Sequence, residues 1–144
     1  MKTISLEECH IDKISELDHL CFSHPWSKTS HLAALIARVS HYFGVFENDI
    51  LIGYGSMYTV LDEGNITNLC THPDHRWSGV ASEVLSALLD KAADLNLSFV
   101  TLEVRESNFA ARQLYEKHGF VNKGIRPLYY RDPREDAVIM TKYL

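Results

Sequence analysis

The sequence predicts an α/β fold in which about four helices flank a mixed central sheet of about seven strands. Short segments with alternating or continuous apolar residues, which are typical of strands, recur along the whole chain. Between them lie segments whose apolar residues repeat every three or four positions, as in amphipathic helices. The long helical segments that join later strands favour helices on both faces of the sheet.

The first half of the chain supplies four strands and two helices. Thr3–Leu6 alternates as a strand does, whereas Cys9–Phe22 has the apolar spacing of a helix. The segment His24–Trp26 interrupts that helix, and Ser27 is the expected N-cap of a second helix that extends to Val39. Three strands are then predicted, with turns at 47–49 and 62–65 between them, at residues 41–46, 50–61 and 66–71.

The second half adds two helices and three strands. Ser78–Asn96 carries its apolar residues on one helical face, and the apolar run Leu97–Val104 predicts a strand buried on both faces. Ser107 or Asn108 is the expected N-cap of a helix that ends before Gly119, a glycine in the C′ position. Two final strands are predicted around a turn at 132–135, at residues 120–130 and 137–144.

Composition indicates a single globular domain, residues 1–144, with 46% hydrophobic and 23% charged residues. No apolar stretch approaches the roughly 20 residues that span a bilayer, and the first residues lack a secretory signal. We therefore expect a cytoplasmic protein without a membrane partner. A net charge of −5 argues against a nucleic-acid partner and is compatible with a cationic one, such as a basic peptide or an amine.

Cysteine and histidine spacing predicts neither disulfides nor a metal site. The three cysteines, Cys9, Cys21 and Cys70, fit no zinc pattern and no disulfide framework, so reduced thiols are expected. His72 and His75 form the densest histidine group, but no further ligands follow at a zinc spacing.

The most informative segment is His72–Leu89, a turn that opens an amphipathic helix directly after an apolar strand. Such a helix start binds anions, because its first N–H groups are unpaired and its dipole adds about half a positive charge. Gly79 and Ala81 leave the backbone open to a bulky phosphate, and Arg76 adds a cation. The expected ligand is a phosphate or pyrophosphate compound; the alternative is an ordinary basic helix start. The spacing fits neither a Walker loop nor the three-glycine dinucleotide fingerprint.

The spacing Arg-x-x-Gly-x-Ala resembles the acetyl-CoA signature of the GNAT superfamily of N-acetyltransferases. Leu102–Phe120 resembles the second half of the acetyl-CoA core of that superfamily, and more narrowly the ribosomal-protein-alanine N-acetyltransferase family, RimI. The resemblance covers nearly the whole chain and continues through Gly124–Arg126, Tyr129-Tyr130, Pro133 and Glu135–Met140, with Phe22, Trp26 and Ser27 before it. Trp77 and Ser78 depart from the family, which commonly has basic or glutamine residues there.

This resemblance implies a GNAT fold and acetyl-CoA as cosubstrate. The implied acetyl-CoA contacts come from a strand end, the turn, the helix start and a second helix cap: Leu69, Cys70, Thr71, Arg76, Trp77, Ser78, Gly79, Val80, Ala81, Ser82 and Asn108. In this fold the pantetheine arm pairs with a strand edge in a V-shaped slot, and backbone N–H groups around residues 69–71 would stabilise the oxyanion.

Two residues are candidates for proton transfer. Glu103 is a charge within an apolar strand, and alternation places it on one face with Thr101 and Arg105. It is either a site residue or a solvent-facing glutamate, for example one paired with Arg105; the RimI resemblance implies a general base. Tyr115 is implied as the general acid, and the alternative is a core aromatic residue.

The loop residues Tyr129, Tyr130 and Arg131 either line the acceptor site, as the resemblance implies, or form an exposed hairpin. Trp26 is expected to be packed rather than in the acceptor groove. Asn108 caps a helix, contacts CoA, or does both.

The resemblance implies an enzyme that transfers acetyl from acetyl-CoA to the N-terminal amine of a ribosomal protein, with alanine as the expected first residue. Direct attack by the amine is expected, because no serine or cysteine nucleophile with a base partner is evident. Two alternatives remain open: a GNAT enzyme that acetylates a small amine, and a non-catalytic acyl-CoA-binding module that keeps the fold.

Overall fold

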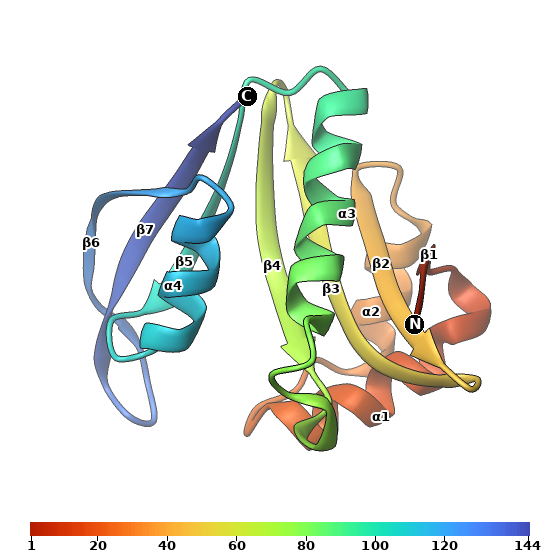
Figure 1. Cartoon of the computed structure of the whole chain (residues 1–144). Helices are drawn as coiled ribbons and strands as arrows, with labels where there is room; N and C mark the ends of the chain where they lie inside the picture. Colours follow the sequence, from red (N-terminus) through yellow and green to blue (C-terminus); the bar gives the residue numbers. More distant parts are fainter.

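A computed structural model describes residues 1–144 and contains one seven-stranded sheet in the order β1-β2-β3-β4-β5-β7-β6 (Figure 1). The strands are β1 Lys2–Ser5, β2 Ser40–Glu47, β3 Ile50–Val60, β4 Glu63–Thr71, β5 Phe99–Arg105, β6 Val121–Tyr130 and β7 Glu135–Tyr143. Only the β4–β5 pair is parallel, and every other neighbouring pair is antiparallel. The sheet is therefore mixed, which confirms the predicted fold class.

Four α-helices flank the sheet: α1 Ile11–Cys21, α2 Lys28–Ile36, α3 Val80–Asp94 and α4 Phe109–Lys117. Two short 3₁₀ turns, Glu8–His10 and Pro73–His75, precede α1 and α3. The Ser27 hydroxyl accepts the Ser30 N–H at 3.1 Å, so the predicted N-cap of α2 is confirmed. None of these helices combines the length and the apolar character that crossing a membrane requires.

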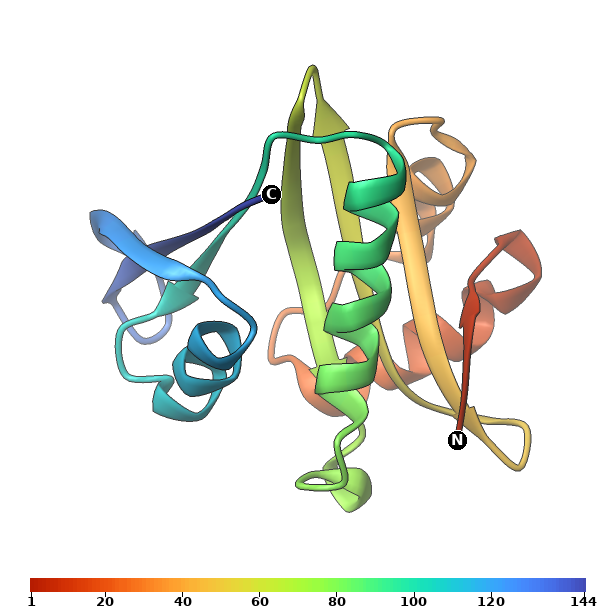
Figure 2. The same ribbon diagram turned by 45° about the horizontal axis from the view of Figure 1, so that its top comes forward.

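Two apolar cores lie on opposite faces of the sheet. The larger core lies under α3 and α4 and contains Val84, Leu85 and Leu88 of α3, which have no exposed surface. The smaller core lies under α1 and α2, and Ile14 and Leu17 of α1 contribute to it. Figure 2 shows α3 running along the sheet while α4 stands apart beside β5 and β7. Burial of each large aliphatic side chain contributes about 1.5–3 kcal/mol, so these cores hold the helices in place.

Two glycines of β3 allow α3 to lie close to the sheet. A Cβ atom at Gly53 would lie 2.3 Å from Cγ1 of Val80, and one at Gly55 would lie 2.7 Å from Cγ1 of Val84. Because real Cβ contacts are much longer, the absence of side chains sets the distance between β3 and α3. This packing places the first turn of α3 beside the end of β4.

The structure corrects four predicted details. The turn before β4 is shorter than predicted, because β3 and β4 form a tight hairpin in which Val60 pairs with Glu63. Helix α3 begins at Val80 rather than at residue 78, and α2 ends at residue 36 rather than at 39. Strand β5 is buried on one face only: Leu102 and Val104 enter the larger core, while the intervening residues are half-buried.

Candidate active site

Strands β4 and β5 separate after a short stretch of pairing. Their parallel register covers Glu63↔Phe99, Gly64↔Val100 and Asn65↔Thr101. Beyond these pairs the strands diverge toward the end of the sheet where α3 begins (Figure 1). Successive N–H groups of a strand alternate in direction, so between residues 66 and 71 every second N–H of β4 faces away from β3. The GNAT resemblance implied such a slot, with a strand edge for a pantetheine arm, whereas no sequence pattern by itself shows the separation.

A β-bulge interrupts β4 within this unpaired stretch. Met57 of β3 pairs with Ile66 and Ser56 pairs with Asn68, so Thr67 is an extra residue. After the bulge, Leu69 packs against the larger core while Cys70 is buried in the smaller one. The side chains of these two predicted contact residues are therefore occupied by packing, which leaves their backbone to face a ligand.

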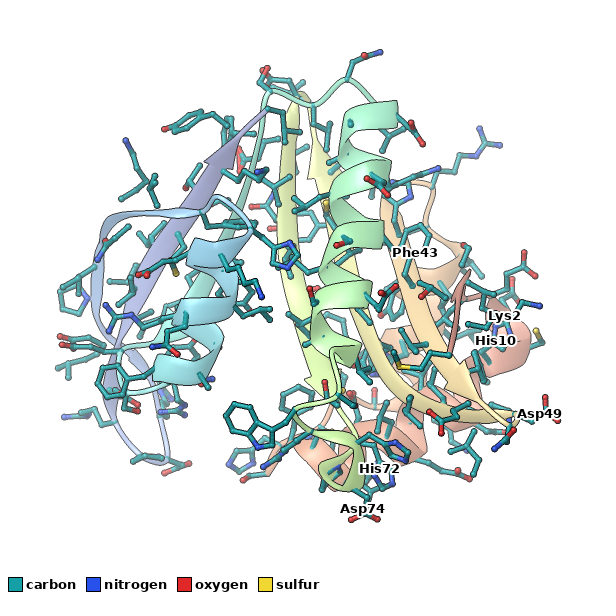
Figure 3. The ribbon with its side chains drawn as sticks, viewed as in Figure 1. Lys2, His10, Phe43, Asp49, His72 and Asp74 are labelled. Carbon is teal, nitrogen blue, oxygen red and sulfur yellow. The ribbon has the colours of Figure 1, made fainter.

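The turn between β4 and α3 is stabilised by its own side chains. The Nδ1 atom of His72 accepts the Asp74 N–H at 3.1 Å, and the Ser78 hydroxyl donates to the carbonyl of His75. Figure 3 shows His72 and Asp74 together below the first turn of α3. The rings of His72 and His75 meet edge-on at 5.4 Å, and no group of three or more potential metal ligands occurs in the chain. The side chain of Ser78, a predicted acetyl-CoA contact, is thus engaged within the turn.

The start of α3 has the properties of an anion site. Its N-cap is Gly79, at φ +82°, and no side chain caps the helix. A Cβ at Gly79 would meet no atom within 4 Å, so the approach to the backbone is open. The first-turn N–H groups are therefore uncapped and accessible, which is the arrangement by which helix starts bind anions.

The side chains around this helix start differ in availability. Val80 is buried and offers only its backbone, whereas the Ser82 hydroxyl lies 2.8 Å from Nε2 of His118. Trp77 is 93% exposed at φ +68°. Arg76 lies close enough to Cys21 to help lower the pKa of that thiol, after the larger effect of its hydrogen bond with Cys70.

Glu103 lies on the face of β5 that is turned away from the larger core. Its side chain is 30% exposed, and Oε1 forms an ion pair with Nε of Arg126 at 3.2 Å. Arg105 instead pairs with Glu135 at 3.3 Å, so the pairing of Glu103 with Arg105 considered from the sequence is wrong. Sequence reasoning missed Arg126, because its distance from Glu103 depends on how β6 pairs with β7.

Tyr115 of α4 lies on the other face of β5. It is 7% exposed and packs against the Phe120 ring at 5.7 Å between centroids. Burial, followed by the nearby Tyr130, raises the pKa of the Tyr115 hydroxyl, so it is protonated at neutral pH. Since Glu103 is on the opposite face, the two side chains can act on one substrate only where β4 and β5 have separated.

Tyr130 lies within electrostatic range of both candidates. Burial, with smaller contributions that include Glu103, raises the pKa of its hydroxyl to about 12. The Arg105 guanidinium lies 4.5 Å from the centre of the Tyr130 ring and donates to the carbonyls of Pro133 and Arg131 at 2.9 and 3.1 Å. Arg105 thereby attaches the loop between β6 and β7 to the end of β5; the resemblance implied that this loop lines the acceptor site, with an exposed hairpin as the alternative.

Asn108 is the N-cap of α4, as predicted. Its side-chain oxygen accepts the Ala111 N–H at 3.2 Å, and the residue is exposed at the start of the helix. The helix-cap interpretation is therefore confirmed, and the exposed side chain is also accessible to a ligand.

Comparison with known proteins agrees with this geometry. Residues 11–120 match the model of the acetyltransferase (GNAT) family. The chain is 34% identical over 143 residues to the [ribosomal protein bS18]-alanine N-acetyltransferase of Haemophilus ducreyi, covering 97% of this chain and 98% of the relative. It is 33% identical over 143 residues to the enzyme of that name from Escherichia coli (strain K12), covering 97% and 96%.

A solved structure extends the comparison. The crystal structure of the ribosomal-protein-S18-alanine N-acetyltransferase from Escherichia coli superposes with a TM-score of 0.91 at 30% identity, covering 99% of this chain and 92% of that one. The chain belongs to the GNAT acetyltransferase family. It is an acetyl-CoA-dependent N-acetyltransferase, similar over nearly its whole length to enzymes that modify a ribosomal protein.

Proposed function

We propose that the protein acetylates, in the cytoplasm, the N-terminal amine of a protein that begins with alanine, with ribosomal protein bS18 as the acceptor. The similarity to enzymes named for this acceptor extends over 96–98% of their length. The observation that supports catalysis most directly is the separation of β4 from β5, with Glu103 on one face of β5 and Tyr115 on the other. The net charge of −5 is compatible with a basic acceptor segment.

Acetyl-CoA would bind along the start of α3 and the unpaired edge of β4. The uncapped N-terminus at Gly79 would hold the pyrophosphate, and Arg76 would add a cation beside it. The other predicted contacts from Leu69 to Ser82 contribute mainly through backbone, since several of their side chains are buried or engaged. Asn108 would contact CoA from the start of α4. The cosubstrate supplies an acetyl thioester whose carbonyl lies against β4.

Glu103 would accept a proton from the acceptor amine, either directly or through a water molecule. The amine nitrogen then forms its bond to the acetyl carbon, the carbon–sulfur bond breaks, and Tyr115 donates its proton to the leaving sulfur. The N–H groups of the β4 edge stabilise the oxyanion. An N-terminal amine has a pKa near 8, against about 10.4 for lysine, so a carboxylate is a sufficient base for the N-terminal acceptor.

The primary test is release of CoA thiol from acetyl-CoA in the presence of a basic peptide that starts with alanine. The same peptide with a blocked N-terminus is the control, and a lysine within both peptides reports side-chain acetylation. Release with the free peptide only is the expected result. Release with a polyamine instead would indicate a small-amine enzyme. No release with any amine, although acetyl-CoA raises the melting temperature, would indicate an acyl-CoA-binding module.

Variants test the two assigned roles. Glu103→Gln should lower kcat/KM by about 10²–10⁴-fold and leave the Kd of acetyl-CoA unchanged. Glu106→Gln is the matched control, because Glu106 is exposed and forms hydrogen bonds only through its backbone: its N–H donates to the Asp136 carbonyl, and its carbonyl accepts from Arg112. Tyr115→Phe should lower kcat more than tenfold, as expected for loss of a proton donor. Equal losses of turnover and acetyl-CoA binding in Glu103→Gln would contradict the general-base role.

A further inference from the structure

A chain of buried polar side chains connects α1 and α2 to β4. Asp18 of α1, His31 of α2 and Tyr54 of β3 have no exposed surface. Oδ2 of Asp18 lies 2.5 Å from Nε2 of His31, and the Tyr54 hydroxyl donates to Oδ1 of Asp18. The side-chain nitrogen of Asn68, on β4, donates to the Tyr54 oxygen at 2.9 Å. We refer to these four residues as the Asp18 network.

The direction of hydrogen bonding in this network determines how Asn68 is oriented. Burial is the largest cause that raises the pKa of the Tyr54 hydroxyl, so the hydroxyl keeps its single proton, which goes to Asp18. Tyr54 can therefore only accept from Asn68, and Nδ2 of the carboxamide must face it. The other end of that carboxamide, Oδ1, is buried and has no hydrogen-bond partner.

This unpaired oxygen indicates that the network is not optimised for folding. Buried acceptors without a partner are rare in folded proteins, because each one loses its bonds to water without replacement. Asn68 is 6% exposed, pairs across the sheet with the buried Ser56 and donates to Tyr54, a member of the smaller core. A leucine of similar shape at position 68 would remove the unpaired oxygen and still leave the bond between Tyr54 and Asp18. The asparagine at this position therefore calls for a role other than stability.

The position of Asn68 in the sheet points to such a role. It follows the bulge residue Thr67 and lies in the part of β4 that has no pairing with β5. Only β3 pairs with this part of β4, so the position of the β4 backbone here depends on the side chains packed beneath it. We propose that Tyr54 and Asn68 are positioning residues for acetyl transfer. The Asn68 side chain is linked through Tyr54 to the buried Asp18, and it thereby holds the unpaired edge of β4 against the acetyl group.

This inference rests on the proposed function, in which N–H groups of that edge stabilise the oxyanion. Such donors act at full strength only when they are held within about 0.5 Å of the productive geometry. Loss of the Asn68 bond would let the edge shift, which slows the chemical step. Binding of CoA would change little, because its pyrophosphate is held at the start of α3, an element separate from the edge of β4.

The test compares Asn68→Leu, Tyr54→Phe and the double variant with Tyr42→Phe as a matched control. The Tyr42 hydroxyl bonds to Nδ1 of His31 at 2.9 Å, within the same core but without a hydrogen bond to β4. For each variant one measures kcat and KM with the alanine peptide, the Kd of acetyl-CoA, and the melting temperature. Asn68→Leu should melt at or above the wild-type temperature while kcat falls about tenfold, which corresponds to about 1.4 kcal/mol in the barrier.

The Kd of acetyl-CoA should stay within about twofold of wild type in every variant. The double variant should lose no more kcat than the larger single loss, because both residues act through one connection. Tyr42→Phe should keep the wild-type kcat.

Wild-type kcat in Asn68→Leu, additive losses in the double variant, or kcat losses that follow the melting temperature would overturn this inference. If Asn68→Leu does not fold, the inference is tested by comparing kcat between Tyr54→Phe, which should lose activity, and Tyr42→Phe, which should not. If the wild-type chain itself transfers no acetyl group, the proposed function fails first and this inference fails with it.

Discussion

Substitution of Gly53 by alanine should displace the start of α3 and thereby weaken acetyl-CoA binding. The added Cβ would lie 2.3 Å from Cγ1 of Val80 and 3.2 Å from the carbonyl oxygen of Cys70. Carbon atoms in contact normally lie about 3.5–4.0 Å apart, so the side chain of Val80 must move by more than about 1 Å. Val80 is buried and β-branched, which leaves it little rotamer freedom, and therefore the helix start moves with it.

The expected cost of this overpacking is about 1–3 kcal/mol of unfolding free energy. At roughly 2–4 °C per kcal/mol for a domain of this size, the melting temperature should fall by roughly 2–12 °C. Because the first-turn N–H groups move with Val80, the Kd of acetyl-CoA should rise about tenfold, the loss of about 1.4 kcal/mol. Urea denaturation measures the first quantity and calorimetric titration with acetyl-CoA measures the second.

A compensating substitution at Val80 tests whether the contact between residues 53 and 80 causes these losses. Val80→Ala alone leaves a cavity and should cost about 1–3 kcal/mol. In the Gly53→Ala, Val80→Ala double variant, the new methyl group at position 53 enters the space that Val80 has left. The loss of unfolding free energy should therefore be smaller than the sum of the two single losses by at least about 0.5 kcal/mol. Additive losses, or a Gly53→Ala protein with wild-type stability and acetyl-CoA affinity, would show that the contact between β3 and α3 does not position the helix.

Three further predictions concern local features. The Cβ added by Gly79→Ala meets no neighbouring atom, so only the strain of φ +82° should lower the unfolding free energy, by about 1–2 kcal/mol as measured by denaturation. Ser27→Ala removes the acceptor of the Ser30 N–H and should lower stability by about 1 kcal/mol, without effect on titration with acetyl-CoA. The bond from Ser107, followed by smaller effects, lowers the pKa of Glu135 below its ordinary 4.5. Its contribution to stability is thus present above pH 4.5 and is lost as pH falls through the lower folded value, so wild type and Glu135→Gln should converge in melting temperature at acidic pH.

Each of these predictions has an outcome that contradicts it. A Gly79→Ala loss well above about 3 kcal/mol would mean that packing, rather than backbone strain, limits this position. Weaker acetyl-CoA binding in Ser27→Ala would connect the α2 cap to the cofactor site. If wild type and Glu135→Gln differ in melting temperature by the same amount at neutral and at acidic pH, the bond between the charged Glu135 and Ser107 is not the cause of that difference.

Local patterns along the chain predicted a large part of this protein. Strands and helices occur in the predicted order, and the caps at Ser27 and Asn108 are in place. These features depend on neighbours three or four residues away, which the sequence displays directly. Element ends were less predictable: the left-handed conformations of Trp77 and Gly79 delay the start of α3, and such conformations leave no periodic signal.

The tertiary structure alone decided the features that join distant segments. Three backbone pairs, ending at Asn65↔Thr101, determine where β4 leaves β5, and no local pattern encodes that point. The partner of Glu103 is Arg126 rather than the nearby Arg105, because the register between β6 and β7 brings Arg126 to it. The Asp18 network likewise draws on two helices and two strands. Such contacts depend on the packing of the whole domain, and for this reason the sequence could name the candidate residues but not the geometry that unites them.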